Sequence, residues 1–155
     1  MRDEYSGSLK GSVLAFDFGK TRIGVAQGNT QIAIAHPVCT ITGKSNQDKF
    51  NQIKKLIDEW QPDFLIVGKP CHLDGTPHEI TQLAEKFARR LYATFRLPVG
   101  LLDERLTSIA AEQRLTEAQT FGKKRKQALD QVAAMEILQS FFNDCVCDKV
   151  MNNQD

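Results

Sequence analysis

Short apolar runs and helical repeats follow one another along the chain, and their order predicts an α/β fold. The first part holds an apolar run at 13–18, a second at 22–27 and an extended segment at 32–41. The first two runs are joined by a short turn, which places neighbouring strands antiparallel. These three segments therefore predict the antiparallel part of a sheet.

The second part alternates helices and strands. Apolar side chains recur at helical spacing in 50–60 and again in 83–95, where Lys86, Arg89 and Arg90 fall on other faces. The continuous apolar run 64–68 and the short run 98–102 are typical of buried strands. Helical crossovers join parallel strands, so we predict a five-stranded mixed sheet, three antiparallel strands and then two parallel ones, flanked by helices.

The remaining segments complete a single domain. Residues 108–115 and 126–142 are predicted helices, and no repeat or long linker divides the 155 residues. We expect one domain over 12–142, with 1–11 and 143–155 as flexible termini. The apolar runs are too short to cross a membrane, a signal peptide is not expected, and the four cysteines lack zinc spacing, so we expect a cytoplasmic protein with reduced thiols.

Asp17 stands out within the first apolar run. On a strand it shares a face with Val13 and Ala15, and a buried carboxylate is costly unless a metal, a basic partner or hydrogen bonds stabilise it. We interpret Asp17 as the first ligand of a metal site. The alternative is that it only caps the turn before the second strand.

Two further acids follow predicted core elements. Asp130 falls at helical spacing with Ala134 and Ile137, on the stripe that should pack against the sheet. Glu104, rather than its neighbour Asp103, is the preferred candidate at the end of the last strand. The alternative for Glu104 is an acid that favours the positive end of a following helix.

Taken together, four motifs resemble the YqgF family, bacterial proteins named as Holliday junction resolvases or pre-16S rRNA nucleases. The resemblance covers about 14–142, in the family's order and spacing. The motifs are Asp17-Phe-Gly-Lys-Thr-Arg-Ile-Gly, Val67-Gly-Lys-Pro leading to Asp74-Gly-Thr, Asp103-Glu-Arg-Leu-Thr-Ser, and Asp130-Gln-Val-Ala-Ala-Met-Glu-Ile-Leu-Gln. Lys69 and His72 depart from the family's usual residues, which puts the chemistry of their loop in question.

The resemblance implies a ribonuclease H-like fold and phosphodiester hydrolysis with a divalent metal, Mg²⁺ or Mn²⁺. Carried over by position, Asp17, Glu104 and Asp130 would be both the catalytic acids and the metal ligands. Hard cations such as Mg²⁺ prefer oxygen ligands, which agrees with this set of side chains. Two such ions could activate a water and stabilise the leaving oxygen.

Nucleic acid is the expected partner, although the formal net charge is only +1, so any basic surface must be local. Residues 105–126 hold six Lys or Arg against two acids, which could bind phosphates or could be a solvated loop. The candidate nucleic-acid contacts are Lys20, Arg22, Arg105, Lys123, Lys124, Arg125 and Lys126.

Family analogy favours 5′-end processing of precursor 16S rRNA, by a monomer or weak homodimer acting on structured RNA or ribosomal precursor particles. One alternative is an endonuclease that cuts Holliday junctions or other branched DNA. Another is a non-catalytic RNA-binding module in ribosome assembly. A third interpretation is the phosphate loop of proteins that close two domains of this kind around ATP. We disfavour it because this chain supplies only one such domain.

Overall fold

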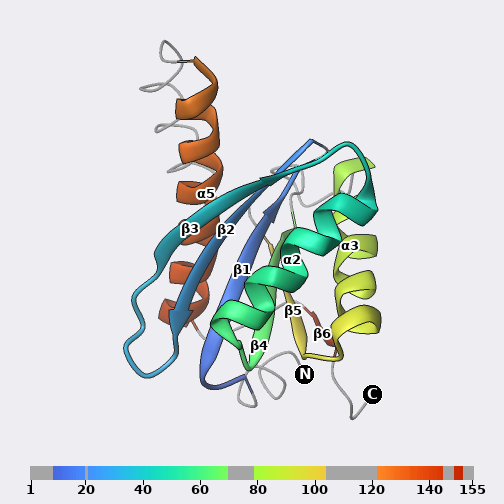
Figure 1. Cartoon of the computed structure of the whole chain (residues 1–155). Helices are drawn as coiled ribbons and strands as arrows, with labels where there is room; N and C mark the ends of the chain where they lie inside the picture. Colours follow the sequence, from blue (N-terminus) through green and yellow to red (C-terminus); the bar gives the residue numbers. More distant parts are fainter. Residues whose placement is uncertain (1–8, 20, 70–78, 104–121, 145–148, 152–155) are drawn as a thin grey trace.

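The computed structural model describes residues 9–19, 21–69, 79–103, 122–144 and 149–151. They form a mixed sheet of six strands in the order β3-β2-β1-β4-β5-β6, with helices on both faces (Figure 1). The strands are β1 (Ser12–Phe18), β2 (Arg22–Asn29), β3 (His36–Thr42), β4 (Phe64–Lys69), β5 (Val99–Asp103) and β6 (Lys149–Met151). The helices are α2 (Asn46–Trp60), α3 (Glu79–Phe95) and α5 (Gly122–Asp144).

β1 lies at the junction between the antiparallel and the parallel part of the sheet. It pairs antiparallel with β2 and parallel with β4, and β4 pairs parallel with β5. Consequently β1, β4 and β5 all end at one edge of the sheet, which we call the carboxyl edge. The opposite edge, where these strands begin, is the amino edge. Ligands in open α/β sheets bind outside the carboxyl ends of strands, at such switch points.

Each face of the sheet has its own hydrophobic core. On one face, side chains of β1 and β4 such as Val13 and Ile66 pack with Ile137 and Phe141 of α5. On the other face, alternate residues of the same strands pack with α2 and α3. Because both faces are covered, the central strands are apolar throughout, and a charged side chain on them can lie only at a strand end.

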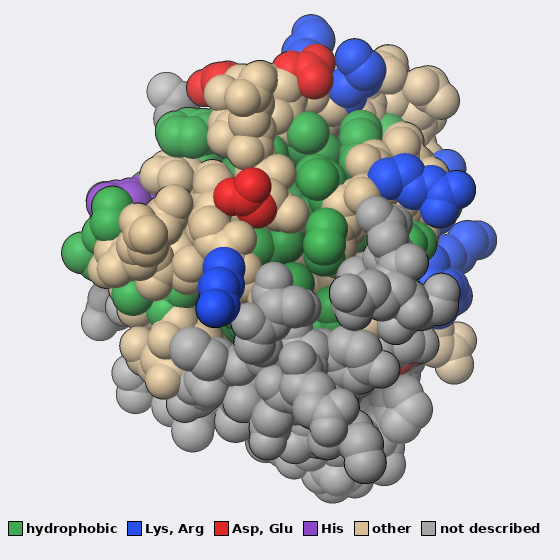
Figure 2. Space-filling view, turned by 90° about the horizontal axis from the view of Figure 1, so that it is seen from below, with side chains coloured by type: hydrophobic (Ala, Val, Ile, Leu, Met, Phe, Trp, Pro, Cys, Tyr) green, Lys and Arg blue, Asp and Glu red, His purple; other side chains and the backbone are tan. Residues whose placement is uncertain are grey.

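At the amino edge, Asp63 links the start of β1 to the start of β4. The backbone N–H of Asp63 donates to the Ser12 carbonyl at 2.7 Å, and the Asp63 carboxylate accepts from the Ser12 N–H at 2.8 Å. Gly11 has φ +108°, and the Asp63 carboxylate occupies the place where a Cβ would lie. These bonds fix the register of the two strands. Figure 2, which views this edge, shows acidic and basic side chains mixed on its surface.

The predicted mixed sheet with flanking helices is confirmed, with two differences at its ends. Lys149–Met151, in the segment expected to be a loose tail, pairs with β5 as β6, and Val150 is buried. Leu9, in the expected lead-in, is buried against the α5 core. A three-residue edge strand carries too few residues for a periodic signal, and only pairing with β5 reveals it.

The final helix is also longer than predicted, because it begins at Gly122 and takes in the basic residues that follow, which are good helix formers. The helix expected at 108–115 lies outside the described residues. None of the helices in the described part of the chain has the length and apolar character needed to cross a membrane.

If β6 is an integral part of the sheet, Val150→Ala should lower the free energy of unfolding by about 1.5–2.5 kcal/mol, since two buried methyl groups are lost. Chemical denaturation followed by circular dichroism would measure this loss. Val38→Ala on β3, the same change at a half-buried position, should cost less. Equal, negligible effects of both changes would show that residues 149–151 do not support the fold.

Candidate active site

Asp17 lies next to the last residue of β1, at the carboxyl edge and on the face covered by α5. Its register partners are glycines on both sides, Gly24 in β2 and Gly68 in β4. Alternation along the strand puts it on the same face as Val13 and Ala15, which are fully buried in the α5 core. Asp17 itself is half-buried. With glycine at both positions, neither neighbouring strand places a side chain directly beside this carboxylate.

Gly24 brings α5 close to Asp17. A Cβ at Gly24 would collide with the Asp130 carbonyl oxygen and would lie 3.0 Å from the Asp130 Cβ. Directly opposed Cβ positions on antiparallel strands are about 4.5–5.5 Å apart, so the Cβ atoms of Asp17 and Asp130 lie within about 8.5 Å of each other. The structure thus brings together two of the three predicted acids, from positions far apart in the sequence.

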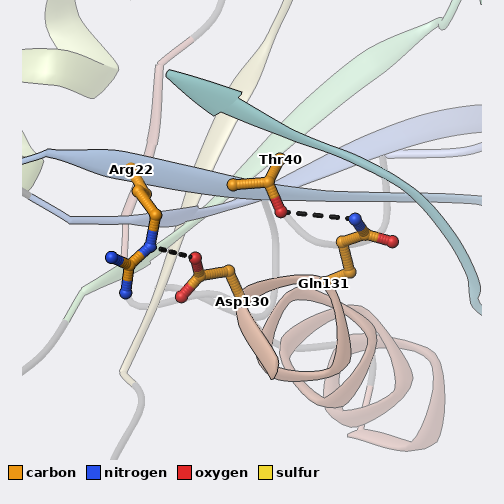
Figure 3. Close-up of polar contacts among 4 residues, drawn as sticks. All are labelled: Arg22, Thr40, Asp130 and Gln131. Carbon is orange, nitrogen blue, oxygen red and sulfur yellow. Dashed lines mark hydrogen bonds and ion pairs between the residues drawn. The ribbon is translucent and has the colours of Figure 1, made fainter. Parts of the chain in front are cut away.

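Asp130 forms an ion pair with Arg22, at the start of β2. The Arg22 Nε lies 2.6 Å from Oδ2 of Asp130, and the two side chains are 37% and 20% exposed (Figure 3). Arg22 is two residues from Gly24 and shares its face of the strand, which explains why it points toward α5. Sequence reasoning named Arg22 only as a nucleic-acid contact and missed this pair. The guanidinium balances one of the two carboxylate charges gathered here.

Further hydrogen bonds hold α5 in place along the antiparallel part of the sheet. Gln131, next to Asp130, donates from its side chain to the Thr40 hydroxyl of β3 at 3.3 Å (Figure 3). Two turns later, the Gln139 amide donates to the Ala33 carbonyl at 3.0 Å and accepts from the Ala35 N–H at 3.3 Å. Because these hydrogen bonds lie at two places along α5, they fix the helix, and with it Asp130, relative to the sheet.

The third predicted acid, Glu104, lies outside the described residues. It directly follows Asp103, the last residue of β5, and Leu102 is level with Gly68 and hence with Asp17 across the three strands. The part of the chain that the structure describes contains no group of three His, Cys, Asp or Glu side chains able to hold a metal. Asp17 and Asp130 supply carboxylate oxygens, the donors that Mg²⁺ prefers, so this pair fits a hard cation as part of its ligand set.

For most of the predicted nucleic-acid contacts, the side chain lies outside the described part of the structure. Lys20, Arg105 and the loop residue His72 lie outside the described residues, as does the side chain of Lys69. The backbone of Lys123 to Lys126 is described and forms the first turns of α5, which extend beyond the carboxyl edge of the sheet (Figure 1). The helix therefore carries this basic segment to the edge where Asp17 lies.

Comparisons with known proteins show which family this sequence resembles. A family model described as "RuvX: Holliday junction resolvase" matches residues 11–144. A protein of Neisseria meningitidis serogroup C (strain 053442), named "Putative pre-16S rRNA nuclease", is 59% identical over 133 residues, which cover 86% of this chain and 88% of the relative. A protein of the same name from Dechloromonas aromatica is 57% identical over 132 residues, covering 85% of this chain and 90% of the relative.

Among solved structures, T. thermophilus RuvC in complex with a Holliday junction substrate matches with a TM-score of 0.51 and 13% identity. The match covers 88% of this chain and 98% of that chain. At this identity the likeness concerns the fold, and it confirms the expected ribonuclease H-like architecture.

Gly24→Ala should destabilise the protein by about 1–3 kcal/mol, because the added methyl group forces α5 away from β2. Thermal unfolding would measure the loss. Gly43→Ala is a matched control, since a Cβ there would meet the Asp48 side chain at 3.0 Å in an exposed turn. Equal melting temperatures for the two variants would contradict the close approach of α5 at Gly24.

The ion pair can be tested by a double-mutant cycle with Arg22→Gln, Asp130→Asn and the double variant. We expect a coupling free energy of about 0.5–1.5 kcal/mol, above that of a fully exposed pair because both side chains are sheltered. The exposed pair Lys54–Asp58, with an N–O distance of 3.4 Å, is the control and should couple more weakly. A coupling of zero between Arg22 and Asp130 would show that the contact does not persist in solution.

Proposed function

The chain belongs to the RuvX family, and from this we propose that it is a nuclease that hydrolyses phosphodiester bonds in the 5′-end processing of precursor 16S rRNA. The observation that carries the proposal is the 59% identity, over most of both chains, to a relative named for this activity. A role in the cytoplasm, on ribosomal precursor particles, follows from such a substrate.

The two neighbouring carboxylates at the carboxyl edge support hydrolysis that depends on a divalent metal. We propose that Asp17 and Asp130, together with Glu104 after β5, hold Mg²⁺ or Mn²⁺ through carboxylate oxygens. When bound, the metal supplies Lewis-acid chemistry, activating water and stabilising the leaving oxygen of the cleaved bond. The protein contributes rigid placement: Asp17 is fixed by strand pairing on both sides, and Asp130 by the close packing of α5 at Gly24.

Arg22 has a positioning role in this proposal. Its guanidinium, 2.6 Å from Oδ2 of Asp130, orients that carboxylate and offsets the repulsion between two anions at one edge. Because the guanidinium pairs with Oδ2, Asp130 could hold a metal through its carboxylate while keeping this bond. Arg22 thereby serves the candidate ligand as a partner outside the metal's own coordination shell, as is common at metal sites.

The basic segment supports a negatively charged polymer as substrate. We propose that Lys20, Arg22, Arg105 and Lys123 to Lys126 contact phosphates on either side of the cleaved bond. Phosphate contacts of this kind position a nucleic acid without reading its sequence. The first turns of α5 lie beyond the carboxyl edge, so a bound strand would run from this segment toward Asp17.

A second candidate substrate is branched DNA, which the description of the family model names. The solved neighbour RuvC is in complex with a Holliday junction, and this chain shares its fold. A junction resolvase cuts two symmetry-related strands and so needs a symmetric dimer. Cleavage of a precursor RNA at one bond has no such requirement. The oligomeric state during cleavage therefore distinguishes the two substrates.

Asp17→Asn should lower Mg²⁺-dependent cleavage of a precursor 16S rRNA fragment by about a hundredfold or more, since a metal ligand worth several kcal/mol of transition-state stabilisation is lost. Single-turnover assays on denaturing gels would measure the rate, with a four-way DNA junction assayed in parallel. Asp58→Asn is the matched control, because Asp58 is exposed on α2 and should keep full activity.

Equal cleavage by the native protein and the Asp17→Asn variant would refute the mechanism. Cleavage of the junction but not of the RNA would replace the proposed substrate by the second candidate. Activity that persists in excess chelator would refute the proposed metal dependence while leaving the nuclease activity in place.

A further inference from the structure

A groove at the carboxyl edge lies on the face of the sheet opposite to Asp130. Its cavity of about 100 Å³ opens between α2 and α3. Aromatic rings form much of its lining: Phe18 and Phe87 lie 5.0 Å apart by ring centroids, and Phe50 meets Phe87 edge-on at 5.8 Å. Among the described residues, the lining consists of Phe18, Asn46, Phe50, Leu83, Lys86, Phe87 and Arg90.

Two cations rim this groove, and none of the described residues that line it is acidic. Lys86 and Arg90 are exposed and one helical turn apart on α3, a spacing at which like charges destabilise a helix. The Arg90 guanidinium lies over the Phe50 ring, 5.1 Å from its centroid. A guanidinium is planar and can itself stack on another flat ring. Packing of the hydrophobic core does not require these two cations to lie beside the aromatic rings.

The groove adjoins the candidate active site through consecutive residues of β1. Asp17 and Phe18 have Cα atoms about 3.8 Å apart, and their side chains point to opposite faces of the sheet. Phe18 is half-buried at the groove, and Asp17 faces α5. A chain that crosses the carboxyl edge would therefore meet the carboxylate on one side and the aromatic groove on the other.

We propose that this groove binds one unpaired nucleotide of the RNA substrate, next to the bond that is cleaved. The base packs against Phe18 and the Arg90 guanidinium, and the phosphate pairs with Lys86 and Arg90. Single-stranded nucleic acids are commonly bound in this way, by aromatic rings within a positively charged groove. An enclosed cavity of about 150 Å³ holds benzene, so this smaller, open one takes the edge of a single base and not a base pair.

This inference rests on the proposed nuclease function, so its test separates binding from cleavage. Affinity for a fluorescein-labelled 12-nucleotide single-stranded RNA would be measured by anisotropy in EDTA. The double variant Lys86→Ala/Arg90→Ala should raise Kd about tenfold at 0.1 M salt and reduce the slope of log K against log salt by about 1.4, because two phosphate contacts are lost.

The matched control is Arg89→Ala/Arg96→Ala, with the same change in charge at exposed residues near the same helix. Like the test pair, it removes one cation–ring contact, since Arg96 lies over Tyr92 at 5.7 Å. We expect this control to change Kd by less than about twofold, because neither Arg89 nor Arg96 lines the groove and so neither contacts the bound phosphate. Equal weakening by the two double variants would overturn the groove as a specific site.

A second variant tests the base. Phe18→Leu keeps an apolar side chain but removes the ring, and should weaken binding of the RNA about fivefold while leaving an abasic oligonucleotide unaffected. If the native protein cleaves the RNA but every groove variant binds as tightly as the native protein, the groove assignment fails and the nuclease function stands. If the native protein binds through the groove but cleaves nothing, the nuclease function fails instead.

Discussion

The candidate site depends on the place where the backbone of α5 touches β2. A helix packs this closely on a strand only where the strand lacks a side chain, and Gly24 supplies that gap opposite Asp17. The contact determines both the height of Asp130 above the sheet and its distance from Asp17. Arg22, two residues away, then pairs with the carboxylate that the helix delivers. One glycine thus sets the geometry of three charged groups.

The two faces of the sheet contribute different chemistry to the same edge. The α5 face brings carboxylates together, and the α2 and α3 face offers aromatic rings rimmed by cations. This division follows from the alternation of a buried strand, because Asp17 and Phe18 are consecutive and must face opposite ways. The apolar interior of β1 excludes charge until the end of the strand, which is where Asp17 lies.

Much of the fold could be predicted from the sequence, because continuous apolar runs and helical spacing report burial directly. The apolar run 64–68 is one such case: it lies in β4, and Phe64, Leu65, Ile66 and Val67 are all buried. The inward position of Asp130 followed from its spacing with Ala134 and Ile137, both buried. The pairing of Arg22 with Asp130, 108 residues apart, could not be predicted, since it depends on which helix covers which strand. The helical spacing predicted only that Lys86 and Arg90 lie on other faces than the apolar residues. Their place at the rim of the aromatic groove comes from the structure.

The reciprocal bonds between Ser12 and Asp63 have a consequence for how such a protein can change over evolutionary time. They fix the alignment of β1 and β4 at the end of the sheet farthest from Asp17. A substitution beside Asp17 removes neither of these two bonds. Side chains that meet the substrate can therefore be exchanged without loss of the bonds that align these two strands.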